Sequence, residues 1–115
     1  MAIPTIGRAI PKRRYQVGEY SAVLLGDIEN LESSRLVYFL ALVKDGTSQP
    51  ALGISFEQTT PPCEHPYCIN LYTNEQEEIL GYSPQSLSLD EFDQGALQTA
   101  MQVLELNDEA PYRLL

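Results

Sequence analysis

The sequence predicts an α+β protein, in which an antiparallel β-meander sheet of four to five strands carries one C-terminal α-helix packed on one face. Three observations support this prediction. The apolar runs 36–43 and 51–56 are joined by a short loop around Asp45 and Gly46, which is the pattern of a β-hairpin. Strand-like segments precede and follow this hairpin, separated by connections of loop length. From Ser88 onward, a helix-start signal is followed by apolar positions at helical period.

The chain of 115 residues has the length of one domain, which we place at residues 15–115, after an N-terminal arm at residues 1–14. Pro4 and Pro11 predict that this arm is extended or loosely docked. Two interpretations of the arm remain open. It is either a frayed terminus with a basic patch, or an arm that lays its positive charge on the acidic body of a neighbouring subunit.

The formal net charge is −9, although four of the seven basic side chains lie in the arm. Because an acidic body repels phosphate backbones and the arm lacks interleaved aromatic residues, we expect no nucleic-acid partner. No apolar run approaches the roughly 18 residues that cross a bilayer, so we expect no membrane association. The first residues place their charge after the apolar positions, the reverse of a secretory signal, which predicts a cytoplasmic protein.

The strands are predicted from apolar runs and turn residues. Residues 15–28 are strand-like, and Gly18 marks a bulge or bend. The hairpin at 36–58 supplies the next two strands, and 67–72 alternates as a fourth. The following residues fit either a short helix or a fifth strand at 79–82. We favour the strand, because two turns of helix are only marginally stable alone.

The last element has the clearest local signals. Ser88 and Glu91 form a capping box, in which each side chain bonds to the backbone of the other residue. A broad apolar face follows, and Asn107 is expected to end the helix. Gly95 weakens a helix by up to about 1 kcal/mol relative to alanine. We therefore expect the helix to approach the sheet closely at this residue.

The run 36–43 is apolar at every position, so both faces of this strand must be covered. A single helix covers one face. The N-terminal arm, curvature of the sheet or a second copy of the protein would cover the other. We therefore expect a homodimer or a protein partner, with four candidate interface residues: Leu36, Tyr38, Leu40 and Leu42.

One segment combines residue types that bind metals, namely Cys63, His65 and Cys68 in the spacing C-x-H-x-x-C. A structural zinc site takes four ligands, and no second pair of ligands accompanies these three. They are therefore an incomplete metal site, and we expect neither a metal nor a cofactor. The alternatives are reduced cysteines, or a disulfide or redox pair.

Signatures of catalysis are missing from the sequence. Cys63 and His65 lie two residues apart in an extended loop, which separates their Cα atoms by about 6.5–7 Å. This is too far for a nucleophile and its base. The seven glycines include no G-x-G pair of a phosphate-binding loop, and the chain has a single histidine. These features favour a non-catalytic role over an enzyme.

The first functional hypothesis is therefore a small non-catalytic interaction module that self-associates through an apolar face or edge of its sheet. The alternative is a small-ligand-binding domain, or a minor enzyme, whose pocket is lined by some of the seven tyrosines. The third hypothesis is a metal site in the loop that contains Cys63, His65 and Cys68.

Overall fold

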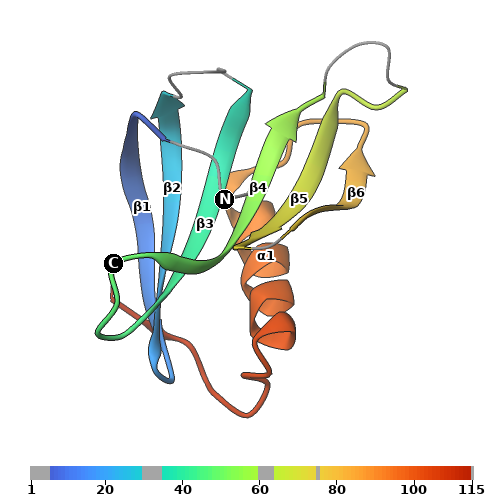
Figure 1. The fold of residues 1–115 in the computed structure, drawn as a ribbon. Coiled ribbons are helices and arrows are strands. Elements are labelled where there is room, and N and C mark those ends of the chain that lie inside the picture. Colours follow the sequence, from blue (N-terminus) through green and yellow to red (C-terminus); the bar gives the residue numbers. More distant parts are fainter. Residues whose placement is uncertain (1–5, 30–34, 60–63, 75, 115) are drawn as a thin grey trace.

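The computed structural model describes residues 6–29, 35–59, 64–74 and 76–114. These residues form a seven-stranded antiparallel sheet and one helix (Figure 1). The sheet order is β6-β5-β4-β3-β2-β1-β7, so six strands form a meander and the last returns to pair with the first. In chain order the elements are β1 (Arg8–Val17), β2 (Tyr20–Glu29), β3 (Leu36–Lys44), β4 (Pro50–Gln58), β5 (Tyr67–Thr73), β6 (Glu77–Ser83), α1 (Leu89–Val103) and β7 (Tyr112–Arg113).

The predicted fold class is confirmed, because one helix packs on one face of an antiparallel sheet. The favoured fifth strand at 79–82 lies within β6. The predicted number of four to five strands is too low. One reason is Gly18, which begins a turn rather than a bulge, with Val17 paired to Tyr20 across it. Its φ of 56° is a conformation that glycine adopts without strain. The segment 15–28 is therefore divided between two strands.

The second reason is that residues 8–14, which were predicted to belong to an arm, are part of a strand. They form most of β1 and pair with β2. Pro11 is tolerated there because β7 pairs with β1 only at Tyr15 and Gln16, which leaves Pro11 on an edge of the sheet. A segment rich in proline and arginine therefore belongs to the sheet.

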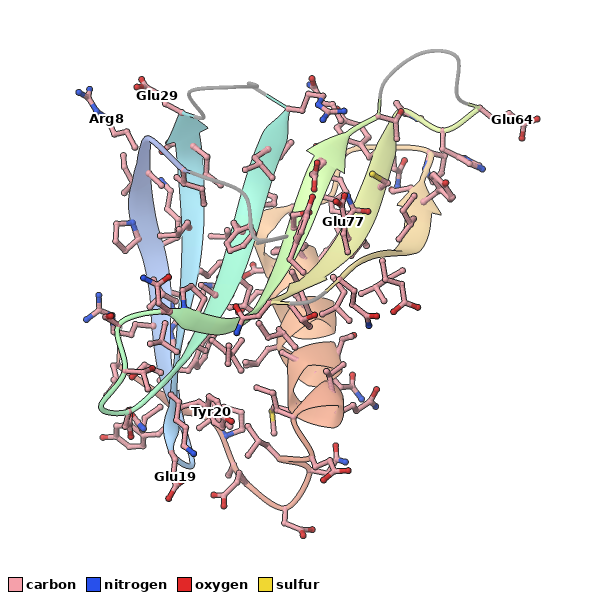
Figure 2. All side chains as sticks on the ribbon, viewed as in Figure 1. Arg8, Glu19, Tyr20, Glu29, Glu64 and Glu77 are labelled. Atoms are coloured by element: carbon pink, nitrogen blue, oxygen red, sulfur yellow. The ribbon has the colours of Figure 1, made fainter. Side chains whose placement is uncertain are left out.

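The basic side chains of β1 form ion pairs within the chain: Arg8 with Glu29 at 3.9 Å, Lys12 with Asp27 at 2.7 Å, and Arg13 with both Asp90 and Asp93. Figure 2 labels the first pair at neighbouring ends of β1 and β2. Much of the positive charge that was considered for binding a neighbouring subunit is thus engaged inside the protomer.

Helix α1 begins as the sequence predicts. The Ser88 side chain accepts a hydrogen bond from the Glu91 N–H, and the Glu91 carboxylate accepts one from the Ser88 N–H at 3.0 Å. This backbone hydrogen bond lowers the pKa of Glu91. The helix ends at the C-cap Leu104, before the predicted Asn107, because Glu105 adopts a positive φ of 58°.

The end of α1 is a Schellman motif. The Leu106 N–H donates to the Met101 carbonyl at 2.7 Å, and the Glu105 N–H donates to the Gln102 carbonyl at 3.2 Å. The expected close approach at Gly95 is wrong, because a Cβ placed there would meet nothing within 4 Å.

Strand β3 is apolar on both faces, as predicted, but its apolar side chains are not divided between the two faces by strict alternation. Leu40 and Leu42 are fully buried in the main core beneath α1, and Tyr38 stacks on Phe92 of the helix. A register shift between Leu36 and Tyr38 turns Leu36 to the opposite face. We call the side away from α1 the open face.

A second, smaller core covers β3 on the open face. Leu36, Phe39 and Tyr72 are buried there, and Phe39 is only 2% exposed. Ile6, which precedes β1, packs against this cluster. The chain therefore covers the central part of both faces by itself, and the uncovered apolar surface lies elsewhere.

Candidate functional site

Exposed apolar side chains lie at both margins of the sheet: Ile10, Tyr112 and Leu114 at the side of β1 and β7, and a group of three on β6, the last strand on the other side. No strand among the described residues pairs with the outer side of β6. Three large apolar side chains of this strand are exposed: Ile79 (52%), Leu80 (40%) and Tyr82 (51%). An edge strand with exposed apolar side chains offers both unpaired backbone groups and hydrophobic surface to another chain.

An apolar hollow lies beside β6 on the helix side of the sheet. Helix α1 packs on β3 and β4, so it does not reach over the edge strand. Between them is a space of about 180 Å³, lined by Leu80, Gly81 and Ile69 from the sheet and by Phe92 and Gly95 from the helix segment. Because Gly95 has no side chain, the hollow stays open along that side of the helix.

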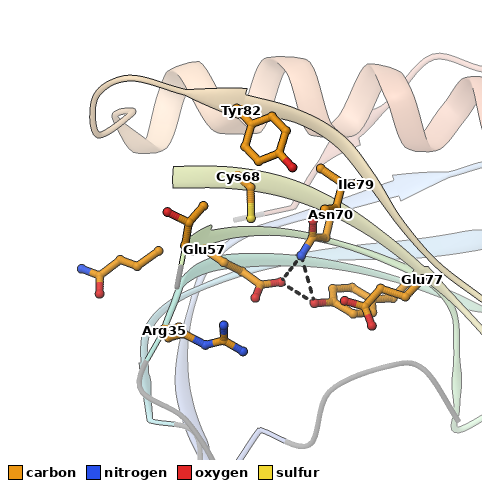
Figure 3. Close-up of a pocket in the computed structure, with 10 residues that line it drawn as sticks. Arg35, Glu57, Cys68, Asn70, Glu77, Ile79 and Tyr82 are labelled. Atoms are coloured by element: carbon orange, nitrogen blue, oxygen red, sulfur yellow. Dashed lines mark hydrogen bonds between the residues drawn. The ribbon is translucent and has the colours of Figure 1, made fainter. Parts of the chain in front are cut away.

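A second hollow, of about 340 Å³, lies on the open face across β4, β5 and β6 (Figure 3). We call it the polar hollow. Glu57 pairs with Cys68, and Cys68 pairs with Tyr82, across neighbouring strands. Residues paired in this way point to the same face of a sheet, so these three side chains share one face. Asn70 and Ile79 form the next such pair.

The floor of the polar hollow is a hydrogen-bonded cluster centred on Glu57, which is only 7% exposed. Its Oε2 atom accepts hydrogen bonds from the hydroxyl groups of Ser55 and Tyr72 and from the amide nitrogen of Asn70, the last at 2.9 Å. Figure 3 shows the Asn70 side chain directed at the Glu57 carboxylate. Three donors on one oxygen replace the water that a carboxylate loses on burial.

This environment changes the pKa of Tyr72. Burial, reinforced by the hydrogen bond to Glu57, raises the pKa of Tyr72 well above its ordinary value. The hydroxyl group therefore keeps its proton and acts as a donor to the carboxylate across the physiological range.

A second buried carboxylate, Asp93 of α1, joins the helix to β1. Its Oδ2 atom accepts hydrogen bonds from the Arg13 guanidinium at 2.7 Å and from the Tyr15 hydroxyl group at 2.5 Å. Burial, then the hydrogen bond to Asp93, raises the pKa of Tyr15. Arg13 and Tyr15 lie on β1 and Asp93 lies on α1, so these hydrogen bonds hold the first strand against the helix. We therefore assign the three side chains a structural role.

The predicted metal-ligand candidates are only partly described. Cys63 lies outside the described residues, and the His65 ring stacks on Tyr82 with 5.6 Å between ring centroids. Cys68 is buried and lines the polar hollow. Within the described part of the chain, no group of three or more His, Cys, Asp or Glu side chains could hold a metal ion.

Three of the four candidate interface residues are buried within the protomer, and Tyr38 is half-buried. Leu36 is 7% exposed, Leu40 and Leu42 are fully buried, and Tyr38 lies between Phe56 and Phe92. Their burial follows from α1 on one face and the Phe39 cluster on the other. Large exposed apolar side chains lie outside this group, on β6 and at the opposite margin at Ile10, Tyr112 and Leu114.

The sequence analysis named Cys68 and a pocket lined by tyrosines, but it did not find the carboxylate and amide that form the floor of the polar hollow. Glu57 was not considered as a candidate, and neither was Asn70. The available signal was polar residues at every second position of apolar strands, as in Ser55 and Glu57 of β4. Such a pattern predicts a polar face but not which strands lie beside each other.

Comparisons with known proteins give no relative: no family model, no curated protein and no solved structure matches the chain. The helix found in the described residues is too short to span a membrane.

Proposed function

We infer that this protein is a non-catalytic interaction module that self-associates through the β6 edge of its sheet. The observation that supports this proposal is the exposure of Ile79, Leu80 and Tyr82 on an edge strand whose outer side has no partner among the described residues. A second copy of β6 would pair with the backbone and cover these side chains at the same time.

The helix side of the sheet supports the same interaction. The apolar hollow between Leu80 and Gly95 adjoins the edge, so side chains from a second copy could fill it. A two-fold arrangement uses the same surface of both copies and closes after two subunits, which predicts a dimer.

Charge is compatible with an antiparallel pair of β6 strands. Glu77 and Glu78 lie at the beginning of the strand and Tyr82 lies near its end. In an antiparallel pair the beginning of one strand lies opposite the end of the other. The carboxylates of one copy then face the tyrosine end of the other copy instead of facing each other.

The opposite margin of the sheet is less suitable for such pairing. There β7 already pairs with β1 at Tyr15 and Gln16, and Pro11 removes a backbone donor. Ion pairs at Arg8 and Lys12 add charge to the same strand. The two edges therefore differ, and we assign self-association to β6.

The experiment is sedimentation equilibrium from low to high micromolar concentration, with two matched variants. Ile79→Lys and Ile10→Lys change the same residue type at nearly equal exposure, 52% and 51%, on strands at opposite sides of the sheet. Both variants add one positive charge. We expect the wild type and Ile10→Lys to dimerise and Ile79→Lys to remain monomeric. A wild type that stays monomeric at high micromolar concentration would refute the proposal, as would equal effects of the two substitutions.

Added salt offers an independent readout. Each copy carries a formal charge of −9, so the two copies repel each other at long range. Because salt screens this repulsion, the dimerisation constant should increase between low and high ionic strength. Dissociation of the dimer by salt would mean that ion pairs, and not the apolar edge, hold it together.

A further inference from the structure

We propose that the polar hollow on the open face is a binding site for a small organic cation with a primary ammonium group. Its polar floor is separate from the edge proposed for self-association, because Glu57 lies on β4 and Asn70 on β5, two strands and one strand inside that edge. Only the wall formed by Ile79 and Tyr82 is shared with the edge.

The first argument is an unsatisfied acceptor. Asn70 is 6% exposed, and its Oδ1 atom is buried without a hydrogen-bond donor among the described residues. A buried carbonyl oxygen without a donor is destabilising, because nothing replaces the hydrogen bonds that it made to water. Asn70 lines the polar hollow, so a ligand donor that enters this space and displaces the atoms covering Oδ1 would remove this penalty.

The orientation of the Asn70 amide follows from its neighbours. The amide nitrogen donates to Glu57 Oε2 at 2.9 Å and lies 3.3 Å from the Tyr72 hydroxyl oxygen. A carboxylate only accepts hydrogen bonds, and the Tyr72 hydroxyl already donates to it. Exchange of the amide nitrogen and oxygen would therefore place two acceptors together. The Oδ1 atom must be the one that is left for a ligand.

The second argument is charge. The hollow is lined by two carboxylates, Glu57 and Glu77, and by one guanidinium, that of Arg35. The whole chain carries −9, so the surrounding field also favours a cation over an anion. An ammonium group brings three donors and a positive charge, which suit Asn70 Oδ1 and the carboxylates together.

The third argument is the wall of the hollow on β6. Tyr82 and Ile79 line it, and the Tyr82 ring is held by stacking on His65. An aromatic ring beside a carboxylate-lined space attracts a cation through its face and also covers an apolar body. A space of about 340 Å³ accommodates a small amine with one ring, and not a long peptide.

The experiment is a titration of ¹⁵N-labelled protein, followed through the Asn70 side-chain amide signals. Three probes of the same size are compared: benzylamine, which is a cation at neutral pH, benzyl alcohol and benzoate. We expect saturable shifts of the Asn70 signals with benzylamine, weaker shifts with benzyl alcohol and none with benzoate. Binding of benzylamine should weaken as salt is added, opposite to the salt dependence expected for dimerisation.

Two matched variants test the position of the site. Glu77 pairs with Tyr72 and lines the hollow, whereas the neighbouring Glu78 pairs with Leu71 and faces the other side of the sheet. Both are exposed, so both glutamine variants should fold. Glu77→Gln should weaken benzylamine binding by about threefold to tenfold, and Glu78→Gln should leave it within about twofold of wild type.

Three results would overturn the inference: no saturable shift with benzylamine, shifts of equal size with benzoate, or equal weakening by Glu77→Gln and Glu78→Gln. Because the readout is the Asn70 signal and not the oligomeric state, a failure here is distinguishable from a failure of the self-association at β6. A monomer that binds benzylamine would refute the proposed function alone.

Discussion

The substitution Gly53→Ala tests how the open face is covered. Gly53 lies on β4 opposite Ala41 and Tyr72, and the Phe39 ring lies across it. A Cβ at residue 53 would come 2.9 Å from Cε1 of Phe39 and closer still to Cζ. Carbon atoms pack at about 3.5–4.0 Å, so the ring must move by about 0.6–1.1 Å or more.

The expected loss of stability follows from the two ways in which the ring can move. If it shifts within the second core, overpacking is destabilising by about 1–3 kcal/mol. If it swings out, the chain loses the burial of a side chain that is now 2% exposed, which is worth about 1.5–3 kcal/mol. By either route, Gly53→Ala should lower the free energy of unfolding by about 2 kcal/mol. At a typical dependence on urea for a small domain, the unfolding midpoint should fall by about 1–2 M.

The assay is urea unfolding followed by far-UV circular dichroism, since the chain has no tryptophan. Gly81→Ala is the control, because a Cβ there meets nothing within 4 Å and should change stability by less than about 0.5 kcal/mol. Gly53→Ala and Phe39→Leu are also combined in a double-mutant cycle. Because leucine at residue 39 has no ring to clash with the new Cβ, it should remove most of the stability lost in Gly53→Ala. A midpoint for Gly53→Ala equal to that of Gly81→Ala, or a penalty unchanged by Phe39→Leu, would refute this account of the open face.

Three further outcomes are expected. Glu105→Gly should raise the free energy of unfolding by about 0.5–1 kcal/mol in urea titrations, because a glycine relieves the positive φ at the end of α1; a loss of stability would contradict the Schellman assignment. Asp93→Ala should lower that free energy by about 3 kcal/mol, whereas Asp90→Ala, whose side chain is 71% exposed, should lower it by less than about 1 kcal/mol; similar losses would argue against a buried joint between helix and sheet. The raised pKa of Tyr72 means that the folded state keeps its proton after the unfolded state has lost it. The contribution of Tyr72 to stability should therefore be constant below about pH 10 and fall as the pH rises further, and Tyr72→Phe should reduce the fall in alkaline urea titrations.

The helix and the central hairpin could be predicted because their signals are local. The capping box joins Ser88 to Glu91, three residues away, and the apolar run 36–43 needs no partner to be read as a strand. The strand β1 could not be predicted in the same way. Its proline and arginine residues carry no strand pattern, and Arg13 finds its partner Asp93 eighty residues further along the chain.

The polar hollow illustrates the same limit. Ser55 and Glu57 of β4 and Tyr72 of β5 are ordinary strand residues when they are read singly. Ser55 reaches the Glu57 carboxylate within β4, but only the register of β4 against β5 brings the Tyr72 hydroxyl group and the Asn70 amide to the same oxygen. The edge of the sheet is also a tertiary property, because an isolated segment does not show whether another strand will follow it.

The sequence by itself determined the fold class, the start of α1 and the need to cover both faces of 36–43, since these depend on spacing within a few residues. Tertiary structure decided that Phe39 and Ile6 cover the second face within one chain, and that exposed apolar side chains lie at the margins of the sheet, β6 among them. The physical reason is that burial and pairing are set by contacts between residues distant in the chain, and the register of neighbouring strands decides which of those contacts form.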